Sequence, residues 1–63
     1  MFIQLTDIGT TNLRGINTDL VQDVAPNLRV FNSTHGTTLY FGEGKYREVS
    51  EPFDVVMDKL NGK

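Results

Sequence analysis

The chain has 63 residues, no cysteine, and a formal net charge of -2 from eight acidic and six basic side chains. The lack of cysteine excludes disulfide bonds, thiolate metal sites and cysteine nucleophiles. The acidic balance argues against a protein whose main task is to grip nucleic-acid backbones. A domain of this size buries only about 60% of the surface that its unfolded chain exposes, so association with a partner is the commonest remaining way to stabilise it.

The first part of the sequence predicts a β-hairpin. Residues 2–7 are rich in β-branched and aromatic residues, and turn-forming residues follow them. A returning strand over residues 13–16 completes the hairpin, and Gly15 marks a possible bulge in it. The oxygens of residues 17–19 (Asn, Thr, Asp) are suited to cap a short turn after that strand.

Two further strand pieces follow, over residues 21–24 and 28–31. Pro26 lies between them and predicts a bulge or a tight bend, because proline cannot donate to a strand ladder. Residues 32–36 are a dense turn cluster, in which Gly36 can supply the positive φ that hairpin loops often require.

The rest of the chain predicts more strand and then one helix. A strand over residues 37–41 pairs back, and a turn over residues 42–45 leads to a short edge strand over residues 46–49. Residues 52–61 predict a helix, because four apolar residues recur at positions i, i+3, i+4 and i+7. They are Phe53, Val56, Met57 and Leu60. A stripe of this kind is typical of a core-facing helix.

Together these elements predict a single small domain over residues 1–63 with an α+β, mostly β fold. It has a four- to five-stranded antiparallel sheet with one C-terminal amphipathic helix packed on one face. Period-2 alternation allows one set of apolar side chains to lie beneath the helix. That set is Ile3, Leu5, Leu28, Val30, Leu39 and Phe41. The opposite face of the sheet then has no element to cover it.

This uncovered face is the candidate interaction surface. Its predicted members are Phe2, Gln4, Arg29, Phe31, Thr38, Tyr40 and Arg47. Because aromatic and arginine side chains are enriched at protein interfaces, the leading hypothesis is a non-enzymatic interaction or regulatory accessory module that forms a homo-oligomer through this face. The alternative is a single-stranded nucleic-acid-binding module that stacks bases on the same aromatic side chains and meets phosphates with Arg29 and Arg47.

Catalytic and metal chemistry find little support in the sequence. His35 is the only imidazole and lies in the turn cluster, so a metal site there would have no second nitrogen ligand. No spacing places His35 beside a serine or threonine nucleophile. We therefore predict no catalytic residue, no metal and no cofactor. An enzyme ranks last among the hypotheses, because it would need an active site shared between subunits.

The sequence also bears on the compartment. No charged leader precedes an apolar run, and no stretch approaches the roughly 18 apolar residues of a membrane span. We therefore expect a cytoplasmic protein with no membrane partner.

Five segments of the chain carry a resemblance to a known family. They are residues 3–6 (Ile-Gln-Leu-Thr), 17–21 (Asn-Thr-Asp-Leu-Val), the Gly36 turn, 49–51 (Val-Ser-Glu) and 55–60 (Val-Val-Met-Asp-Lys-Leu). In this combination they resemble the small FlbD-like flagellar family. The sequence departs from the family pattern at residues 41–47, where extra residues intervene before the helix. The resemblance implies a mostly β accessory protein without enzymatic activity and with a flagellar protein as partner. A bacterial or phage accessory protein that binds a host factor is the other origin that such a chain suits.

Overall fold

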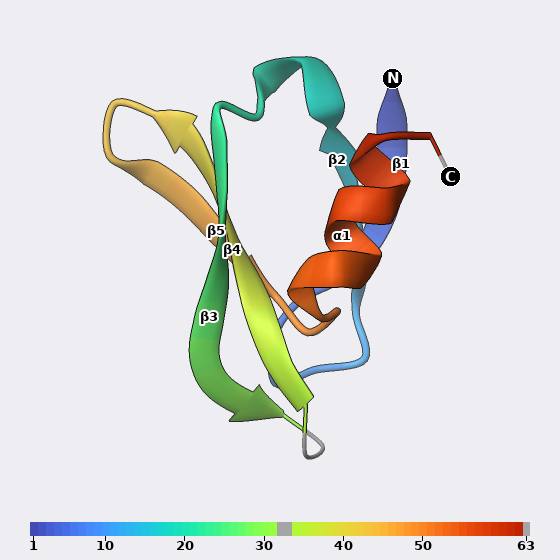
Figure 1. Ribbon diagram of the computed structural model, residues 1–63, viewed down its shortest axis with the longest axis vertical. Helices are drawn as coiled ribbons and strands as arrows, with labels where there is room; N and C mark the ends of the chain where they lie inside the picture. Colours follow the sequence, from blue (N-terminus) through green and yellow to red (C-terminus); the bar gives the residue numbers. More distant parts are fainter. Residues whose placement is uncertain (32–33, 63) are drawn as a thin grey trace.

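The computed structural model describes residues 1–31 and 34–62, with all their side chains except those of Val30, Phe31 and Thr34. Within these residues, five strands precede one α-helix (Figure 1). In chain order the elements are β1 (Phe2–Thr6), β2 (Leu13–Asn17), the 3-10 helix η1 (Thr18–Leu20), β3 (Asp23–Phe31), β4 (Thr34–Gly42), β5 (Lys45–Val49) and α1 (Phe53–Leu60). The fold is mostly β with a C-terminal helix, as the sequence predicts.

The strands are divided between two antiparallel sheets, not joined in the single four- to five-stranded sheet expected from the sequence. β1 pairs with β2, and β4 lies between β3 and β5 in the second sheet. The pairing of β1 with β2 is regular across Gly15, which lies opposite Gln4. The bulge expected at Gly15 is therefore wrong. The Asn17 side chain accepts a hydrogen bond from the Asp19 amide at 3.1 Å and so caps η1, as predicted.

The two sheets meet at one corner. Asp7, just after β1, forms an isolated antiparallel bridge with Val49, and the Ile8 amide donates to the carbonyl of Glu48 at 3.3 Å. Beyond this corner β1 and β5 form no ladder in the described residues. Away from this corner, the β1–β2 hairpin therefore leaves the edge of the three-stranded sheet and packs against one of its faces.

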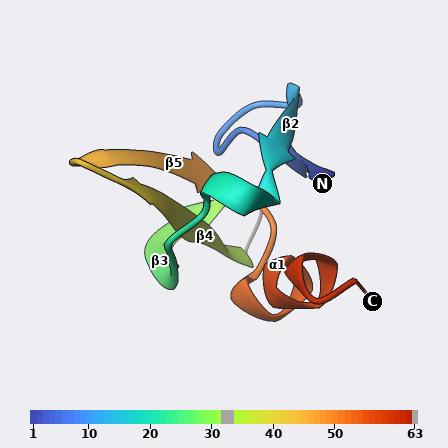
Figure 2. The ribbon, with the colours of Figure 1, turned by 90° about the horizontal axis from the view of Figure 1, so that it is seen from above.

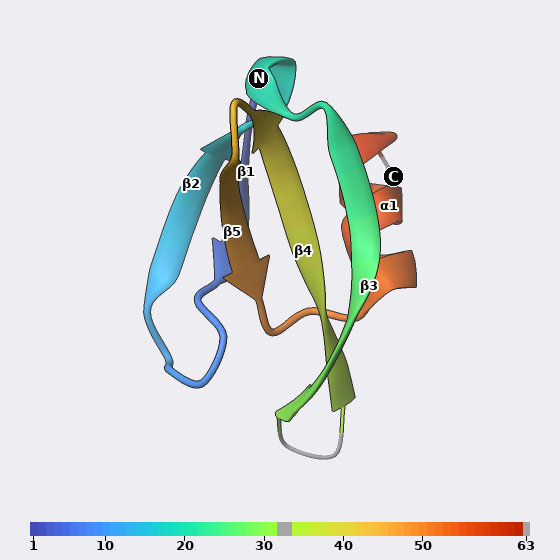
Figure 3. The same ribbon diagram turned by 90° about the vertical axis from the view of Figure 1, so that its left-hand side faces the viewer.

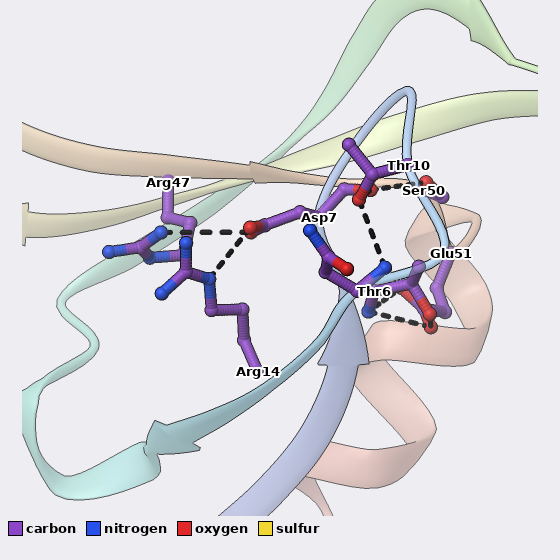
Figure 4. A network of polar contacts seen from close by, with 8 residues as sticks. Thr6, Asp7, Thr10, Arg14, Arg47, Ser50 and Glu51 are labelled. Atoms are coloured by element: carbon purple, nitrogen blue, oxygen red, sulfur yellow. Dashed lines mark hydrogen bonds and ion pairs between the residues drawn. The ribbon is translucent and has the colours of Figure 1, made fainter.

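A second set of polar contacts ties this corner to the start of α1. The Glu51 carboxylate accepts hydrogen bonds from the Thr6 amide at 2.9 and 3.0 Å and from the Thr6 hydroxyl at 2.9 Å. The Ser50 amide donates to the Thr6 carbonyl at 2.8 Å, and the Thr37 hydroxyl donates to the Glu51 carbonyl at 2.7 Å. These contacts join the end of β1, the centre of β4 and the turn before the helix. Figure 4 shows Thr6, Ser50 and Glu51 together at this place.

The core lies between three elements. Figures 1 and 2 show that α1 and the β1–β2 hairpin lie on the same side of the three-stranded sheet. The buried apolar side chains between them are Leu5, Ile16, Leu39, Val49 and Val56, and the partly buried ones around them are Ile3, Val21, Val24, Phe41 and Leu60. The helix and the hairpin together cover one face of the three-stranded sheet. Both lie on that side, and neither covers the other face.

One apolar residue expected in the core lies in solvent. Leu28 is 83% exposed. Between the pairs Pro26–Thr37 and Val30–His35 the register advances by four residues in β3 and by only two in β4. This bend breaks the period-2 alternation on which the prediction for Leu28 depended. The bend itself was predicted from Pro26.

The predictions for two glycine-containing turns fared differently in the structure. Glu43 and Gly44 form a two-residue turn between β4 and β5, and their φ values of 55° and 76° are those of a type I′ hairpin. Gly36, by contrast, is buried inside β4 and does not have a positive φ, so its expected role in the turn is wrong. Of the predicted turn cluster, residues 32–33 lie outside the described residues.

The helix has the predicted core stripe, within slightly shorter bounds than 52–61. Val56 is fully buried, Met57 and Leu60 are partly buried, and Phe53 is 36% exposed at the margin. α1 begins after Pro52, which has no N–H to leave unpaired. With eight residues α1 is far shorter than a membrane span, and no helix in residues 1–31 and 34–62 is long and apolar enough to cross a bilayer.

Candidate functional site

The face of the three-stranded sheet that points away from α1 is open (Figure 3). Leu39 points into the core, so its neighbours in β4, Thr38 and Tyr40, point to the other side. Residues directly opposite each other on paired strands share a face. The open face therefore carries two rows: Asp23, Tyr40 and Tyr46, and Ala25, Thr38 and Glu48.

The first row presents a pair of tyrosines to solvent. Tyr40 is 41% exposed and Tyr46 is 60% exposed. Their ring centroids are 6.3 Å apart and the ring planes are inclined by 44°, which is within the separation of about 4.5–7 Å at which aromatic rings attract each other. We call Asp23, Tyr40 and Tyr46 the tyrosine row.

The second row is covered by the bend of β3. The Asn27 side-chain amide donates to the Thr38 hydroxyl at 2.8 Å and to the Glu48 carboxylate at 2.9 Å. The Arg29 guanidinium lies 3.4 Å from the same carboxylate. As a result Thr38 is only 7% exposed. Among the side chains that the structure describes, the accessible aromatic rings of the open face are therefore those of the tyrosine row.

The structure separates the predicted interaction residues. Arg29, Thr38 and Tyr40 share the open face, although Thr38 is covered. Phe2 and Gln4 are exposed, but they lie in β1 and belong to the other sheet. The assumption that one sheet face holds all of these residues is thus wrong.

Arg47 lies on the face opposite to the tyrosine row. It is paired with Leu39, whose side chain is in the core, and its guanidinium reaches the edge of the sheet, 3.6 Å from the Asp7 carboxylate. The other Asp7 oxygen accepts a hydrogen bond from Arg14 at 2.7 Å (Figure 4). Asp7 thus holds two guanidiniums at the corner where the two sheets meet.

Tyr46 belongs to the candidate site, although the predicted set does not contain it. A one-residue bulge in β4 separates the pairs Tyr40–Tyr46 and Gly42–Lys45, and the sequence does not mark this bulge. Pairing counted back from the turn at residues 43–44 without a bulge would place Tyr46 opposite Phe41 and Arg47 opposite Tyr40, so only the bulge brings Tyr46 onto the face of Tyr40. Phe31, which is in the predicted set, lies in β3, but its side chain is outside what the structure describes.

A groove of about 860 Å³ lies between β2 and the tip of the β4–β5 hairpin. Its apolar lining includes Phe2, Ile16, Leu20 and Phe41, and its basic lining is Lys45 and Arg47. Phe2 is 69% exposed and Leu20 is 61% exposed. We call this cavity the β2–β5 groove. It is the place where Phe2 and Arg47, two of the predicted residues, come together.

The titratable residues form no cluster of metal-ligand type. His35 is exposed and lies in β4, not in a turn. In the described part of the chain, no three or more His, Cys, Asp and Glu side chains are grouped so that they could hold a metal ion. What the described surface offers to other molecules is the tyrosine row, the β2–β5 groove and the arginine pair at Asp7.

No family model, no curated protein and no solved structure matches this chain. The resemblance to the FlbD-like family, with the accessory role and the flagellar or host partner that it implies, therefore stays a prediction.

Proposed function

We propose that this protein is a non-enzymatic interaction module that pairs with a second copy of itself through the open face of its three-stranded sheet. The observation that carries the proposal is the exposure of Tyr40 and Tyr46 on that face, while the other face of the same sheet is covered by α1 and the hairpin. Tyrosine is among the residues that contribute most of the binding energy at protein interfaces.

The small core supports association. Only five apolar side chains are buried among the described residues. Natural domains have unfolding free energies of roughly 0.05–0.15 kcal/mol per residue, or about 3–9 kcal/mol for a chain of this length. Binding to a second copy stabilises the folded chain relative to the unfolded one, and this stabilisation rises with protein concentration. Pairing would therefore add stability that one copy cannot supply.

The tyrosine row is suited to a twofold contact. A twofold axis brings the same patch of two copies together, so the patch must complement itself. The row contains phenol hydroxyls, which donate hydrogen bonds, and the carboxylate of Asp23, which accepts them, on adjacent strands. A phenol of one copy can thus donate to the Asp23 carboxylate of the other while the rings pack together.

Replacing both tyrosines by glutamate should abolish the pairing. In the double variant Tyr40→Glu, Tyr46→Glu we expect the dimer to weaken by at least about tenfold, because burying an unpaired carboxylate costs more than the roughly 1.4 kcal/mol that corresponds to this factor. Light scattering over a range of concentrations measures it. The mass of the unmodified protein should rise from 7.1 kDa toward twice that value, while the variant stays at the lower mass.

Leu13→Glu is the matched control for this experiment. Leu13 is 65% exposed and lies in β2, so the change adds one of the two negative charges of the double variant at an exposed apolar site outside the open face. Its dimer should be as strong as that of the unmodified protein. A monomer at every concentration before any change, or a double variant that still pairs, would contradict the proposal.

A single-stranded nucleic-acid binder is the second candidate, because the two exposed rings could stack bases. The charges of the open face oppose it, since Asp23 and Glu48 lie on the same face and Arg29 is already paired with Glu48. We therefore expect no binding of an eight-nucleotide oligothymidine at low salt in a fluorescence-anisotropy titration. Binding that weakens steeply with salt, and that is lost in Tyr40→Leu, would favour this candidate over self-association.

A further inference from the structure

The β2–β5 groove is a second candidate binding surface, and it does not depend on self-association. Its lining runs along β5 from Gly44 to Arg47, and Arg47 reaches Asp7 at the corner where the hairpin leaves the three-stranded sheet. β5 is an end strand of its sheet, and among the described residues its backbone bonds to the hairpin are confined to its last residues, where Glu48 accepts from Ile8. The first part of β5 therefore borders the groove without a neighbouring strand on that side.

The backbone of β5 presents hydrogen-bonding groups along this edge. The carbonyl of Glu48 points to the hairpin side, because it accepts a hydrogen bond from the Ile8 amide. The N–H and C=O of alternate residues in a strand point to the same edge. Tyr46, two residues earlier, therefore directs its backbone N–H and C=O to the groove side of β5, where an added strand could pair with them.

The apolar lining is arranged to receive side chains. The Phe2 ring lies over Gly15, since a Cβ on that glycine would be 3.7 Å from Phe2 Cδ2. Ile16 and Phe41 extend the apolar surface from the core to the groove, and Leu20 lies at its margin. A strand that occupies the groove would thus meet aromatic and aliphatic contacts as well as a backbone edge.

The charge of the groove indicates the charge of a strand that could bind in it. Arg14 and Arg47 share the single carboxylate of Asp7, which leaves a positive excess at this corner. Lys45 is exposed and forms no ion pair within residues 1–31 and 34–62. The chain as a whole is acidic, so the groove is a local reversal of the protein's charge and complements a negatively charged segment.

We propose that the β2–β5 groove binds an extended polypeptide segment of alternating acidic and apolar residues, which adds as a strand to the free edge of β5. Its backbone pairs with Tyr46, its apolar side chains contact Phe2 and Leu20, and its carboxylates lie near Lys45 and Arg47. A nucleic acid fits this surface less well, because only Lys45 offers a cation that no carboxylate of the described residues already holds.

The test uses two capped hexapeptides, one alternating glutamate and valine and the other alternating lysine and valine. Each is titrated into the isotopically labelled full chain at low salt, and backbone amide shifts are followed by NMR. We expect saturable shifts centred on residues 44–47 and 15–17, with the acidic peptide binding at least about fivefold more tightly than the basic one. The Tyr46 amide should also become protected from hydrogen exchange.

Lys45→Glu separates this proposal from non-specific attraction. It should invert the preference between the two peptides, while Lys59→Glu, the same charge change in α1 away from the groove, should leave the preference as it is. The proposal is overturned if neither peptide gives saturable shifts, if both bind equally, if the shifts lie outside the groove, or if an oligothymidine shifts the groove amides and the acidic peptide does not. Because the tyrosine-to-glutamate double variant tests pairing of two copies by mass, failure of self-association and failure of the groove are separate results.

Discussion

Replacing Leu39 by alanine should remove most of the stability of the fold. Leu39 is fully buried at the centre of β4, opposite Val24 in β3 and beneath the core contributed by α1 and the hairpin. Truncation of a buried leucine to alanine costs about 2–5 kcal/mol, against a total of about 3–9 kcal/mol expected for a chain of this length. We expect Leu39→Ala to be largely unfolded at room temperature. Urea unfolding followed by circular dichroism, at one fixed protein concentration, measures the change.

Leu28→Ala is the control with identical chemistry. The same atoms are removed at a residue that is 83% exposed, so the unfolding free energy should change by no more than about 0.5 kcal/mol. The pair also tests the bend of β3. If Leu28→Ala destabilises the protein as much as Leu39→Ala does, then Leu28 is in the core, as simple alternation along the strand predicts, and the bend is not where the structure places it.

The elements were largely predictable because each has a local cause. The helix follows from the spacing of Phe53, Val56, Met57 and Leu60, of which Val56 and Leu60 pack in the core and Met57 is partly buried. The bend of β3 follows from Pro26, which cannot donate to a ladder. Turn-forming residues mark the connections between β1 and β2 and between β4 and β5. Such signals depend only on residues close together in the sequence, so the sequence alone is enough to read them.

The division into two sheets was not predictable from the same signals. Period-2 alternation says which residues of a strand share a face, but it does not say which strands are neighbours. The corner depends on contacts such as the Asp7–Val49 bridge and the Glu51 carboxylate on Thr6, which join residues more than forty positions apart. No local pattern marks these pairings.

The candidate site was only partly predictable for a related reason. A bulge of one residue shifts the alternation by one, so the bulge between Tyr40 and Gly42 places Tyr46 on the open face and Arg47 on the other. Thr38 was correctly placed on the face of Tyr40, but its cover by Asn27 comes from the bend of β3. Tyr40 was correctly placed on the face opposite to Leu39, because no irregularity separates these two residues in β4.

Gly36 is the position at which the structure gives glycine a role that the sequence did not show. It lies inside β4, where a Cβ would clash with the carbonyl oxygen of Val49 and come within 3.0 Å of Ile8 Cδ1. The carbonyl cannot easily retreat, since Val49 is fully buried and pairs with both Thr37 and Asp7. We expect Gly36→Ala to destabilise the protein by about 1–3 kcal/mol, or more if the backbone must shift. Urea unfolding measures the loss.

Gly15→Ala is the matched control, and the comparison tests the corner itself. Gly15 also lies in a strand without a positive φ, but a Cβ there would make only an ordinary contact of 3.7 Å with Phe2. Its replacement should leave stability unchanged or raise it by up to about 1 kcal/mol, because alanine restricts the unfolded chain more than glycine does. Gly36→Ala should also speed hydrogen exchange of the Ile8 and Ser50 amides, whose bonds hold the two sheets together. If both variants are equally stable, Gly36 does not lie against the Val49 carbonyl. The hairpin and the three-stranded sheet then do not meet at Asp7 and Val49 as the structure shows.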